Sequence, residues 1–115
     1  MTSHAAVIRG IIKYLKKNRI WHLKLHGSSF QRSGVLDIQA CNLGKTIFIE
    51  VKMPDDDLSE LQLLEIKNLL KAGIQYAVVG TVAEGIAAIG WIENAGLLPI
   101  KQTARSHAVL SVTVA

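Results

Sequence analysis

Two carboxylates and an ammonium group stand out in the stretch Gly34–Lys52 because they interrupt apolar, strand-like sequence. Asp37 lies in the first of two β-branched runs, and Glu50 and Lys52 lie at the end of the second. Glu50 and Lys52 are two residues apart, so on a strand their side chains point to the same face. Carboxylate oxygens beside an ammonium group can polarise a phosphate and activate water with the help of a divalent cation. These residue types therefore indicate phosphoryl chemistry.

A hairpin between the two runs would bring the carboxylates together. The runs are separated by Asn42–Lys45, which reads Asn-Leu-Gly-Lys and is typical of a tight turn. A turn centred on its Leu and Gly pairs Cys41 with Thr46. The same register places Asp37 directly opposite Glu50, with their Cβ atoms roughly 4.5–5.5 Å apart. Like charges at this distance destabilise a sheet, so a divalent cation is the natural compensation, and oxygen ligands favour Mg²⁺ or Mn²⁺ over Zn²⁺.

Each part of this pattern also has a purely structural explanation. Glu50 and Lys52 could form a solvated ion pair on a strand surface, and Asp37 could lie at the entrance of a strand. The neighbouring Ile, Val and Phe residues argue against both explanations. Charges within apolar strands carry a desolvation cost that ordinary surface chemistry does not demand.

Three short motifs, in this order, resemble those of the PD-(D/E)xK nuclease superfamily. They are Gly34-Val35-Leu36-Asp37, Ile49-Glu50-Val51-Lys52 and Leu58-Ser59-Glu60-Leu61-Gln62. Within the superfamily they are most similar to the virus-type replication-repair nuclease (VRR-NUC) domain, whose pattern is G-x-P-D, I-E-V-K and L-S-x-x-Q. Leu36 replaces the proline of the first motif. The resemblance extends from the first expected helix to about Gly80.

The resemblance implies a divalent-metal-dependent DNA endonuclease that hydrolyses phosphodiester bonds. Asp37, Glu50 and the main-chain carbonyl of Val51 would hold Mg²⁺ or Mn²⁺. Lys52 would orient the attacking water or stabilise developing negative charge. Gln62 would position the reacting group. The candidate catalytic residues are therefore Asp37, Glu50, Lys52 and Gln62.

Three features of these motifs leave alternatives open. Ser59 and Gln62 fit a capping box at the start of a helix, which explains Gln62 without catalysis. Members of the family usually carry an acidic residue near the start of the first helix. His4 lies roughly there, either as a substitute ligand or as a frayed helix-terminal residue. The acidic run Asp55–Asp57 could bind a second cation or cap the following helix.

Basic residues are concentrated in the N-terminal third of the chain. Residues 1–36 contain seven Lys or Arg and no Asp or Glu, whereas the rest of the chain contains six basic and nine acidic residues. This distribution suits binding to a phosphate backbone, although basic helix faces also serve only to keep proteins soluble. The candidates for contacts with the DNA backbone are Arg9, Lys13, Lys16, Lys17, Lys24 and Arg32.

Hydrophobic periodicity predicts an α-β-β-β-α-β-α order of elements. This order gives an α/β fold with a restriction-endonuclease-like core, a mixed β-sheet flanked by helices. The first helix begins at Thr2 or Ser3 and runs to about Asn18. Apolar and polar residues alternate in Ile20–His26, which predicts a strand with one buried side. The residues expected on that side are Trp21, Leu23 and Leu25.

Three further elements are predicted after Lys52 in the sequence. They are a helix that begins near Ser59 and ends at Gly73, a strand over Gln75–Gly80 and a helix over Val82–Asn94. The helix-length connection allows this strand to lie parallel to the strand that carries Glu50. The uncharged tail Ala108–Val114 would either join the sheet or meet a second subunit.

Length and composition are those of one globular domain over residues 1–115. Cys41 is the only cysteine, so no internal disulfide is possible. No signal peptide or membrane span is visible, and we expect a cytoplasmic protein. The sequence also contains no Walker or dinucleotide-binding glycine pattern, no zinc-ligand spacing and no Gly-x-Ser-x-Gly elbow, which removes the commonest enzyme alternatives.

The resemblance further implies a phage-type homodimer that acts on branched DNA such as Holliday junctions, in DNA repair or recombination of a phage or a bacterium. A dimer fits that task because two strands must be cut by one complex. The alternative is a catalytically inactive DNA-binding or assembly module on the same fold. The absence of an acidic residue from the first helix, Leu36 in place of proline and the run Asp55–Asp57 favour this alternative. The presence of Asp37, Glu50 and Lys52 together argues against it.

Overall fold

The computed structural model describes residues 3–25 and 34–93 of the chain. Within these ranges, helices and strands follow one another in the expected α-β-β-β-α-β-α order. They are α1 (His4–Lys17), β1 (Trp21–Lys24), β2 (Ile38–Asn42), β3 (Lys45–Val51), α2 (Glu60–Lys71), β4 (Gln75–Val79) and α3 (Val82–Glu93). The tail Ala108–Val114, which we expect to join the sheet or to meet a second subunit, lies outside the described residues.

The four strands form one mixed sheet in the order β1-β2-β3-β4. β2 is antiparallel to both of its neighbours, whereas β3 and β4 are parallel. The parallel pair is possible because α2 carries the chain back along the sheet between these two strands. The mixed sheet predicted from the sequence is therefore confirmed.

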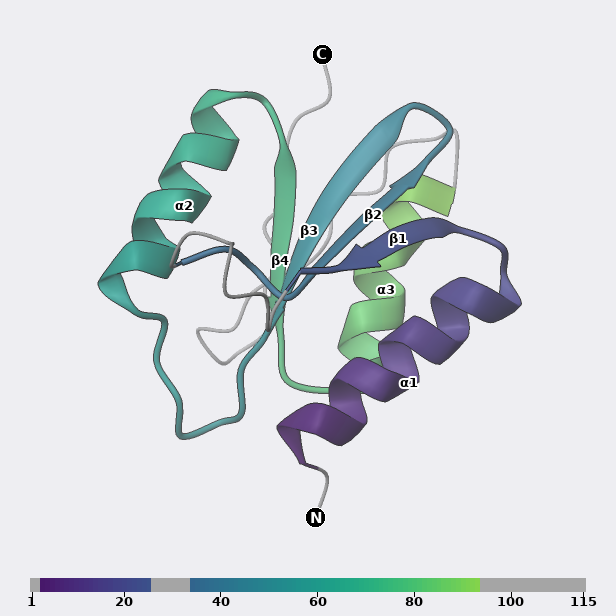
Figure 1. Ribbon diagram of the computed structural model, residues 1–115, viewed down its shortest axis with the longest axis horizontal. Coiled ribbons are helices and arrows are strands. Elements are labelled where there is room, and N and C mark those ends of the chain that lie inside the picture. The colour runs from purple at the N-terminus through teal and green to yellow at the C-terminus, as the bar shows by residue number, and fades with distance from the viewer. Residues whose placement is uncertain (1–2, 26–33, 94–115) are drawn as a thin grey trace.

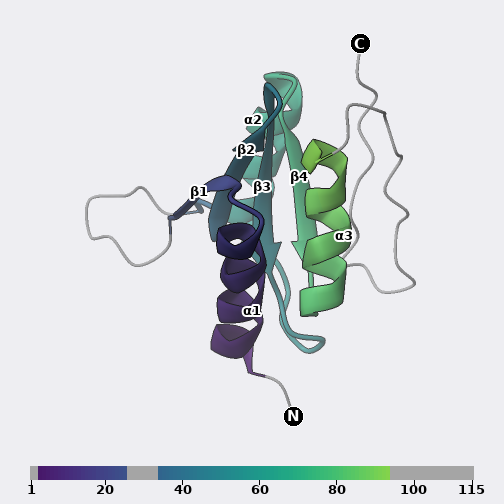
Figure 2. The ribbon, with the colours of Figure 1, turned by 90° about the vertical axis from the view of Figure 1, so that its right-hand side faces the viewer.

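The helices cover the two sides of the sheet unequally. In Figure 1 the strands lie between α2 on the left and α1 with α3 on the right. Figure 2 shows α1 and α3 side by side against the sheet. The larger core cluster lies under these two helices, and its sheet residues are Ile38, Ala40, Ile47, Ile49, Val51, Ala77 and Val79. The smaller cluster lies on the α2 side and consists of Leu36, Ile66, Tyr76 and Val78.

The β2–β3 hairpin has the register that its turn predicts. Leu43 and Gly44 have φ angles of 52° and 76°, and two positive φ angles at the centre of a turn match the twist of the flanking strands. With this turn, the ladder ends with the pair of Ile38 and Ile49, so that Asp37 and Glu50 meet at the next position. The predicted register is confirmed.

Strand β1 differs from the sequence-based expectation, because Trp21 and Leu23 are not buried. Their exposed fractions are 52% and 48%. β1 lies at the edge of the sheet, and α2 packs against β4 alone among the described elements. Of the helices that the structure describes, none therefore covers this side of β1. Alternation shows that a strand has two unlike sides, but it does not show which side another element covers.

Helix α2 carries its own capping signals and an apolar outer surface. Ser59 is the N-cap, and Gly73, with a φ of 79°, follows the C-terminal end of the helix. Ile66 is buried against the sheet. Four leucines of the helix are exposed, namely Leu61, Leu63, Leu64 and Leu70. Over the part of the chain that the structure describes, no helix has the length and apolarity needed to cross a membrane.

Candidate active site

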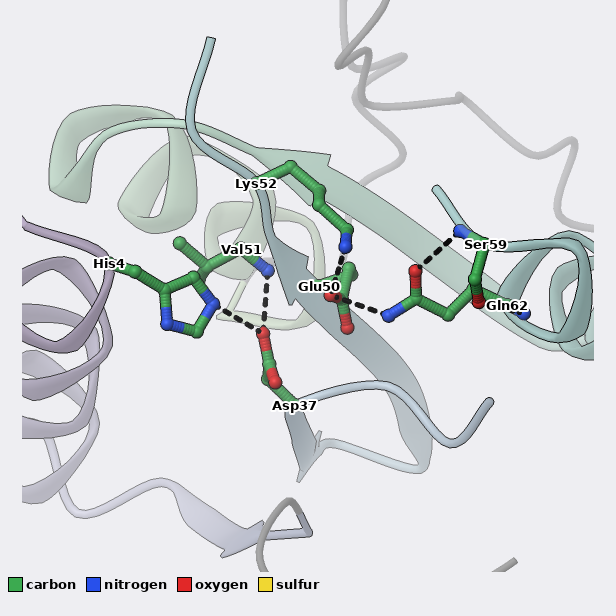
Figure 3. Close-up of polar contacts among 7 residues, drawn as sticks. All are labelled: His4, Asp37, Glu50, Val51, Lys52, Ser59 and Gln62. Atoms are coloured by element: carbon green, nitrogen blue, oxygen red, sulfur yellow. Dashed lines mark hydrogen bonds and ion pairs between the residues drawn. The ribbon is translucent and has the colours of Figure 1, made fainter. Parts of the chain in front are cut away.

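Four of the side chains singled out in the sequence meet where β2 begins and β3 ends (Figure 3). Asp37 directly precedes β2, Glu50 lies in β3, Lys52 directly follows β3 and Gln62 lies in the first turn of α2. Asp37 and Glu50 are each only 2% exposed. Their functional roles stay predictions, but the structure places them together.

The carboxylate of Asp37 is fixed by the main chain of β3. The N–H of Val51 donates to Asp37 Oδ2 at 2.9 Å, and this hydrogen bond is buried. The main-chain carbonyl of Asp37 accepts from the N–H of Leu25 at 2.8 Å. Asp37 is therefore held by the main chain of β3 on one side and by that of Leu25, directly after β1, on the other.

Glu50 is contacted by an amide and an ammonium group. The side-chain Nε2 of Gln62 donates to Glu50 Oε2 at 2.9 Å, and Lys52 Nζ lies 3.8 Å from the same oxygen. The side chain of Lys52 is only 18% exposed, so solvent screens this ion pair less than a surface pair. The other oxygen, Glu50 Oε1, is buried and has no hydrogen-bond partner among the described residues.

The environment of Glu50 opposes its negative charge. Burial and the neighbouring carboxylate of Asp37 raise the pKa of Glu50 from 4.5 to about 8, although Lys52 and Gln62 act in the opposite direction. A buried carboxylate oxygen without a donor is a favourable position for a cation. The arrangement thus fits a hard divalent ion, which would supply the positive charge that these side chains lack.

The number of protein ligands also bears on this fit. In residues 3–25 and 34–93 there is no group of three or more His, Cys, Asp or Glu side chains that could hold a metal ion. Mg²⁺ is usually bound through one or two carboxylates and keeps several of its waters, so Asp37 and Glu50 satisfy its ordinary requirement. Zn²⁺ would require more nitrogen or sulfur ligands than this site offers.

Gln62 caps α2 and also contacts Glu50, whereas its role in positioning the reacting group stays a prediction. Its Oε1 accepts the N–H of Ser59 at 2.9 Å, while its own N–H donates to Ser59 Oγ at 3.1 Å, which completes a capping box. The remaining amide group, Nε2, points to Glu50 (Figure 3). The cap orients the side chain, and the oriented side chain donates to the carboxylate.

His4 lies against Asp37 and is not an isolated group at a frayed end. Ser3 is the N-cap of α1, and His4 is the first residue of the helix. His4 Nε2 lies 3.5 Å from Asp37 Oδ2, with 42% of the histidine side chain exposed. The start of α1 therefore supplies one nitrogen to the edge of the site, and a role as a metal ligand stays a prediction.

Gly34 allows the segment before Asp37 to approach α2 closely. Its φ is 91°, and a Cβ atom at this position would lie 2.6 Å from the carbonyl oxygen of Leu61. Both the left-handed backbone and the contact require glycine. The first and third sequence motifs are thus in direct main-chain contact, which positions the carboxylate motif relative to the helix that carries Gln62.

The chain is similar to a known protein in structure but not in overall sequence. No family model matches the sequence, and no curated protein is significantly similar to it. A solved structure of a VRR_NUC domain is similar with a TM-score of 0.65 and 24% sequence identity, over 84% of this chain and 100% of that chain. The chain has the VRR-NUC fold. At the level of the fold, the resemblance to VRR-NUC domains is therefore confirmed. The expected restriction-endonuclease-like core is confirmed with it.

On this VRR-NUC fold, the basic residues of α1 follow one exposed side of the helix. Arg9, Lys13 and Lys16 recur at helical spacing, and Lys17 is exposed beside them. The 14 residues of α1 span about 20 Å, and the helix begins at His4 beside Asp37. The basic side of α1 therefore leads from the site towards the far end of the domain.

The other predicted contacts with DNA are only partly described. Lys24 is exposed at the end of β1, whereas Arg32 lies outside the described residues. The side chains of Asp55–Asp57 are exposed in the connection between β3 and α2. Ser59, and not this acidic run, provides the N-cap of α2.

Proposed function

We propose that the protein is a divalent-metal-dependent DNA endonuclease that hydrolyses phosphodiester bonds. The observation that carries this proposal is the carboxylate of Glu50, which is buried beside Asp37 and Lys52 with one oxygen left without a donor. A fold-stabilising ion pair would not require a second buried carboxylate or leave an acceptor without a partner. Both features suit a site that takes up a cation and a phosphate.

Asp37, Glu50 and the main-chain carbonyl of Val51 would hold Mg²⁺ or Mn²⁺. When bound, such an ion polarises a phosphate oxygen and lowers the pKa of a water molecule. Asp37 contributes a carboxylate whose orientation is set by the N–H of Val51. Glu50 contributes a carboxylate that is oriented by Gln62.

Lys52 would act on the reacting groups themselves. Its ammonium group lies 3.8 Å from Glu50 Oε2, at the point where β3 ends and the chain turns away from the sheet. From this position it would orient the attacking water or stabilise the negative charge that develops on the phosphate. A cationic group in a site of low polarity has a larger effect on such a charge than one in bulk water.

The finer features of the substrate belong to the same proposal. The protein would act on branched DNA, such as a Holliday junction, during DNA repair or recombination in the cytoplasm of a bacterium or a phage-infected cell. It would act as a homodimer, because two copies can cut two strands of a junction within one complex. The exposed leucines of α2 offer an apolar surface that such an association would bury.

The proposal is tested by nicking of a four-way junction and of a linear duplex in Mn²⁺, Mg²⁺ or EDTA. Wild-type protein is expected to cleave the junction only with a divalent ion, and Lys52→Ala is expected to abolish cleavage. Lys67→Ala, which removes an exposed lysine of α2, is the matched control and should retain activity. Binding of Mn²⁺ by calorimetry, lost in Asp37→Asn, tests the metal site without any turnover.

A catalytically inactive DNA-binding or assembly module is the second candidate. The observation that favours it is the small number of ligands, since the described part of the chain has two buried carboxylates and no larger metal-binding group. Folded wild-type protein that binds the junction but does not cleave it with either ion would establish this candidate. Asp37 and Glu50 would then be remnants of an ancestral site.

A further inference from the structure

Within residues 3–25 and 34–93, the helices cover only part of the width of the sheet on the side that faces α2. Helix α2 packs on β4, at one edge, and leaves the same side of β1 uncovered at the other edge. Trp21 and Leu23 lie on this uncovered part and are about half exposed. A tryptophan at such a position costs hydrophobic stabilisation, so its exposure calls for a partner.

The sheet register aligns these apolar side chains with the candidate active site. Trp21 is opposite Cys41, and Leu23 is opposite Gln39. Directly after the end of β1, the N–H of Leu25 donates to the carbonyl of Asp37 at 2.8 Å. Side chains at every second position of a strand share one side, so Trp21, Leu23 and Leu25 form a row that ends at Asp37.

The length of this row is set by strand geometry. Trp21 and Leu25 are four residues apart, which corresponds to about 13 Å along the strand. This distance is roughly four base steps of a stacked DNA strand. A strand whose phosphate lies at Asp37 and Glu50 can thus bring a base a few nucleotides away over the indole ring of Trp21.

The charge around the row is complementary to DNA. Arg19 is exposed shortly before Trp21 in the chain. Lys24 is also exposed, but it pairs with Ile38 and so points to the side of the sheet that α1 covers. No Asp or Glu occurs between Met1 and Leu36, and β2 contains none either. An exposed aromatic ring with an exposed cation close to it in the chain is suited to a nucleic acid strand, which offers a base to the ring and a phosphate to the cation.

The same charges argue against a second copy of the chain as the occupant. In a symmetric dimer through this side of β1 the same patch is present on both subunits, so Arg19 would be repeated across the contact, and neither residues 3–25 nor β2 would supply an Asp or Glu to neutralise it. Like charges that face each other across an interface weaken it. DNA makes use of these charges, whereas self-association would have to overcome them.

We propose that Trp21 is a stacking platform for an unpaired base, with Leu23 and Leu25 as the apolar floor that leads from it to the cleavage site. The ligand class is a DNA segment with unstacked bases, such as a single strand or the arm of a branch point. Blunt duplex DNA, whose bases are stacked on one another, does not offer a base to the ring. This inference rests on the proposed function, because the row ends at the carboxylates that would hold the metal.

The test uses the two tryptophans of the chain. Trp91 is 7% exposed, so Trp91→Phe keeps its buried aromatic bulk and leaves Trp21 as the only indole. This variant is titrated in EDTA with a short oligothymidylate and with a blunt duplex of the same length. The single strand is expected to quench the fluorescence of Trp21 and the duplex is not.

Binding by fluorescence anisotropy gives an independent measurement in the otherwise wild-type chain. Trp21→Ala is expected to weaken binding of the single strand by about 5- to 150-fold, which corresponds to the usual contribution of one base–aromatic stack. Trp21→Phe should restore most of the affinity, and binding of the blunt duplex should not change. Leu43→Ala, which truncates another exposed apolar side chain on the β2–β3 turn, is the control and should have no effect.

Two results would overturn the inference. One is an unquenched Trp21 in protein that binds the single strand. The other is Trp21 emission that depends on protein concentration without DNA, together with a loss of self-association in Trp21→Ala, which would identify a protein interface. Because these measurements are made without a divalent ion, they are separate from hydrolysis. Quenching of Trp21 without cleavage in Mn²⁺ would reject the proposed nuclease activity and support the proposed base-binding site. Cleavage without quenching would reject only the base-binding site.

Discussion

The side-chain amide of Gln62 connects the first turn of α2 to the carboxylate of Glu50, with 2.9 Å between Gln62 Nε2 and Glu50 Oε2. Its other end accepts the N–H of Ser59 at 2.9 Å. One amide thus satisfies the helix terminus and a buried carboxylate at the same time. The position of α2 and the orientation of Glu50 are therefore coupled.

We expect Gln62→Ala to weaken Mn²⁺ binding by about 10- to 100-fold, since residues that orient metal ligands have effects of this size. The matched control is Ser59→Ala, which removes the hydroxyl of the cap but leaves the N–H of Ser59 for Gln62. This control should lower the free energy of unfolding by about 1 kcal/mol and leave Mn²⁺ binding unchanged. Calorimetry and denaturant unfolding measure the two quantities. Equal losses of Mn²⁺ affinity in both variants would contradict a direct role of the Gln62 amide.

The raised pKa of Glu50 predicts how stability depends on pH in the metal-free protein. In the unfolded chain this carboxyl loses its proton near pH 4.5, whereas in the folded chain it keeps the proton up to about pH 8. Between these values the folded state binds more protons than the unfolded state. By linkage, the contribution of Glu50 to stability is full below pH 4.5 and is lost as the pH rises to about 8.

Glu50→Gln removes this ionisation and keeps the size of the side chain. In EDTA at pH 8, the variant is expected to exceed wild type in free energy of unfolding by on the order of a few kcal/mol, and the difference should shrink towards pH 4.5. Asp57→Asn, at an exposed position, is the control and should keep the pH dependence of wild type. Urea unfolding at several pH values gives the comparison. Parallel curves for wild type and Glu50→Gln would show that Glu50 is not perturbed by its surroundings.

The basic side of α1 predicts a specific dependence of DNA binding on salt. Each phosphate contact that is lost reduces the slope of log affinity against log salt by about 0.9 for duplex DNA. The double variant Lys13→Gln/Lys16→Gln should therefore reduce this slope by about 2 and weaken binding to all sequences alike. Lys67→Gln, on the opposite side of the sheet, is the control and should keep the slope of wild type. A reduction of the slope in the control alone would place the DNA on the α2 side of the domain.

The sequence was sufficient to predict the centre of the candidate site because local rules determine it. The Asn-Leu-Gly-Lys turn fixes the register of the hairpin, and the register places Asp37 beside Glu50. Gln62 could be predicted as well, since a capping box orients its side chain at the start of α2. In each case the deciding contacts lie within a few residues of a recognisable turn or cap.

The exposure of Trp21 could not be predicted in this way. Its burial depends on whether α2 extends over β1, which is set by the packing of a helix about forty residues later in the chain. The unpaired oxygen of Glu50 is a similar case, because it results from several elements that meet around one carboxylate. The contact of His4 with Asp37 likewise depends on the path of α1 across the sheet.

The outer surface of α2 predicts where the proposed homodimer would form. Leu63 and Leu70 are 52% and 41% exposed and lie two turns apart, on one side of the helix. In a symmetric antiparallel contact between two copies of α2, the N-terminal Glu60 of one copy approaches the C-terminal Lys71 of the other. This surface therefore combines apolar area with charges that match under two-fold symmetry, unlike the basic surface around Trp21.

We expect wild-type protein to have the mass of a dimer by light scattering at micromolar concentration, and Leu63→Glu/Leu70→Glu to have the mass of a monomer. Leu43→Glu, at an exposed leucine on the β2–β3 turn, is the control and should stay dimeric. Because all these leucines are exposed, the unfolding free energy of each monomer should change little. The monomeric variant should still nick one strand of a junction but should lose paired cuts within one binding event. A wild-type monomer at every concentration, with paired cuts retained, would show that one copy cuts both strands in turn.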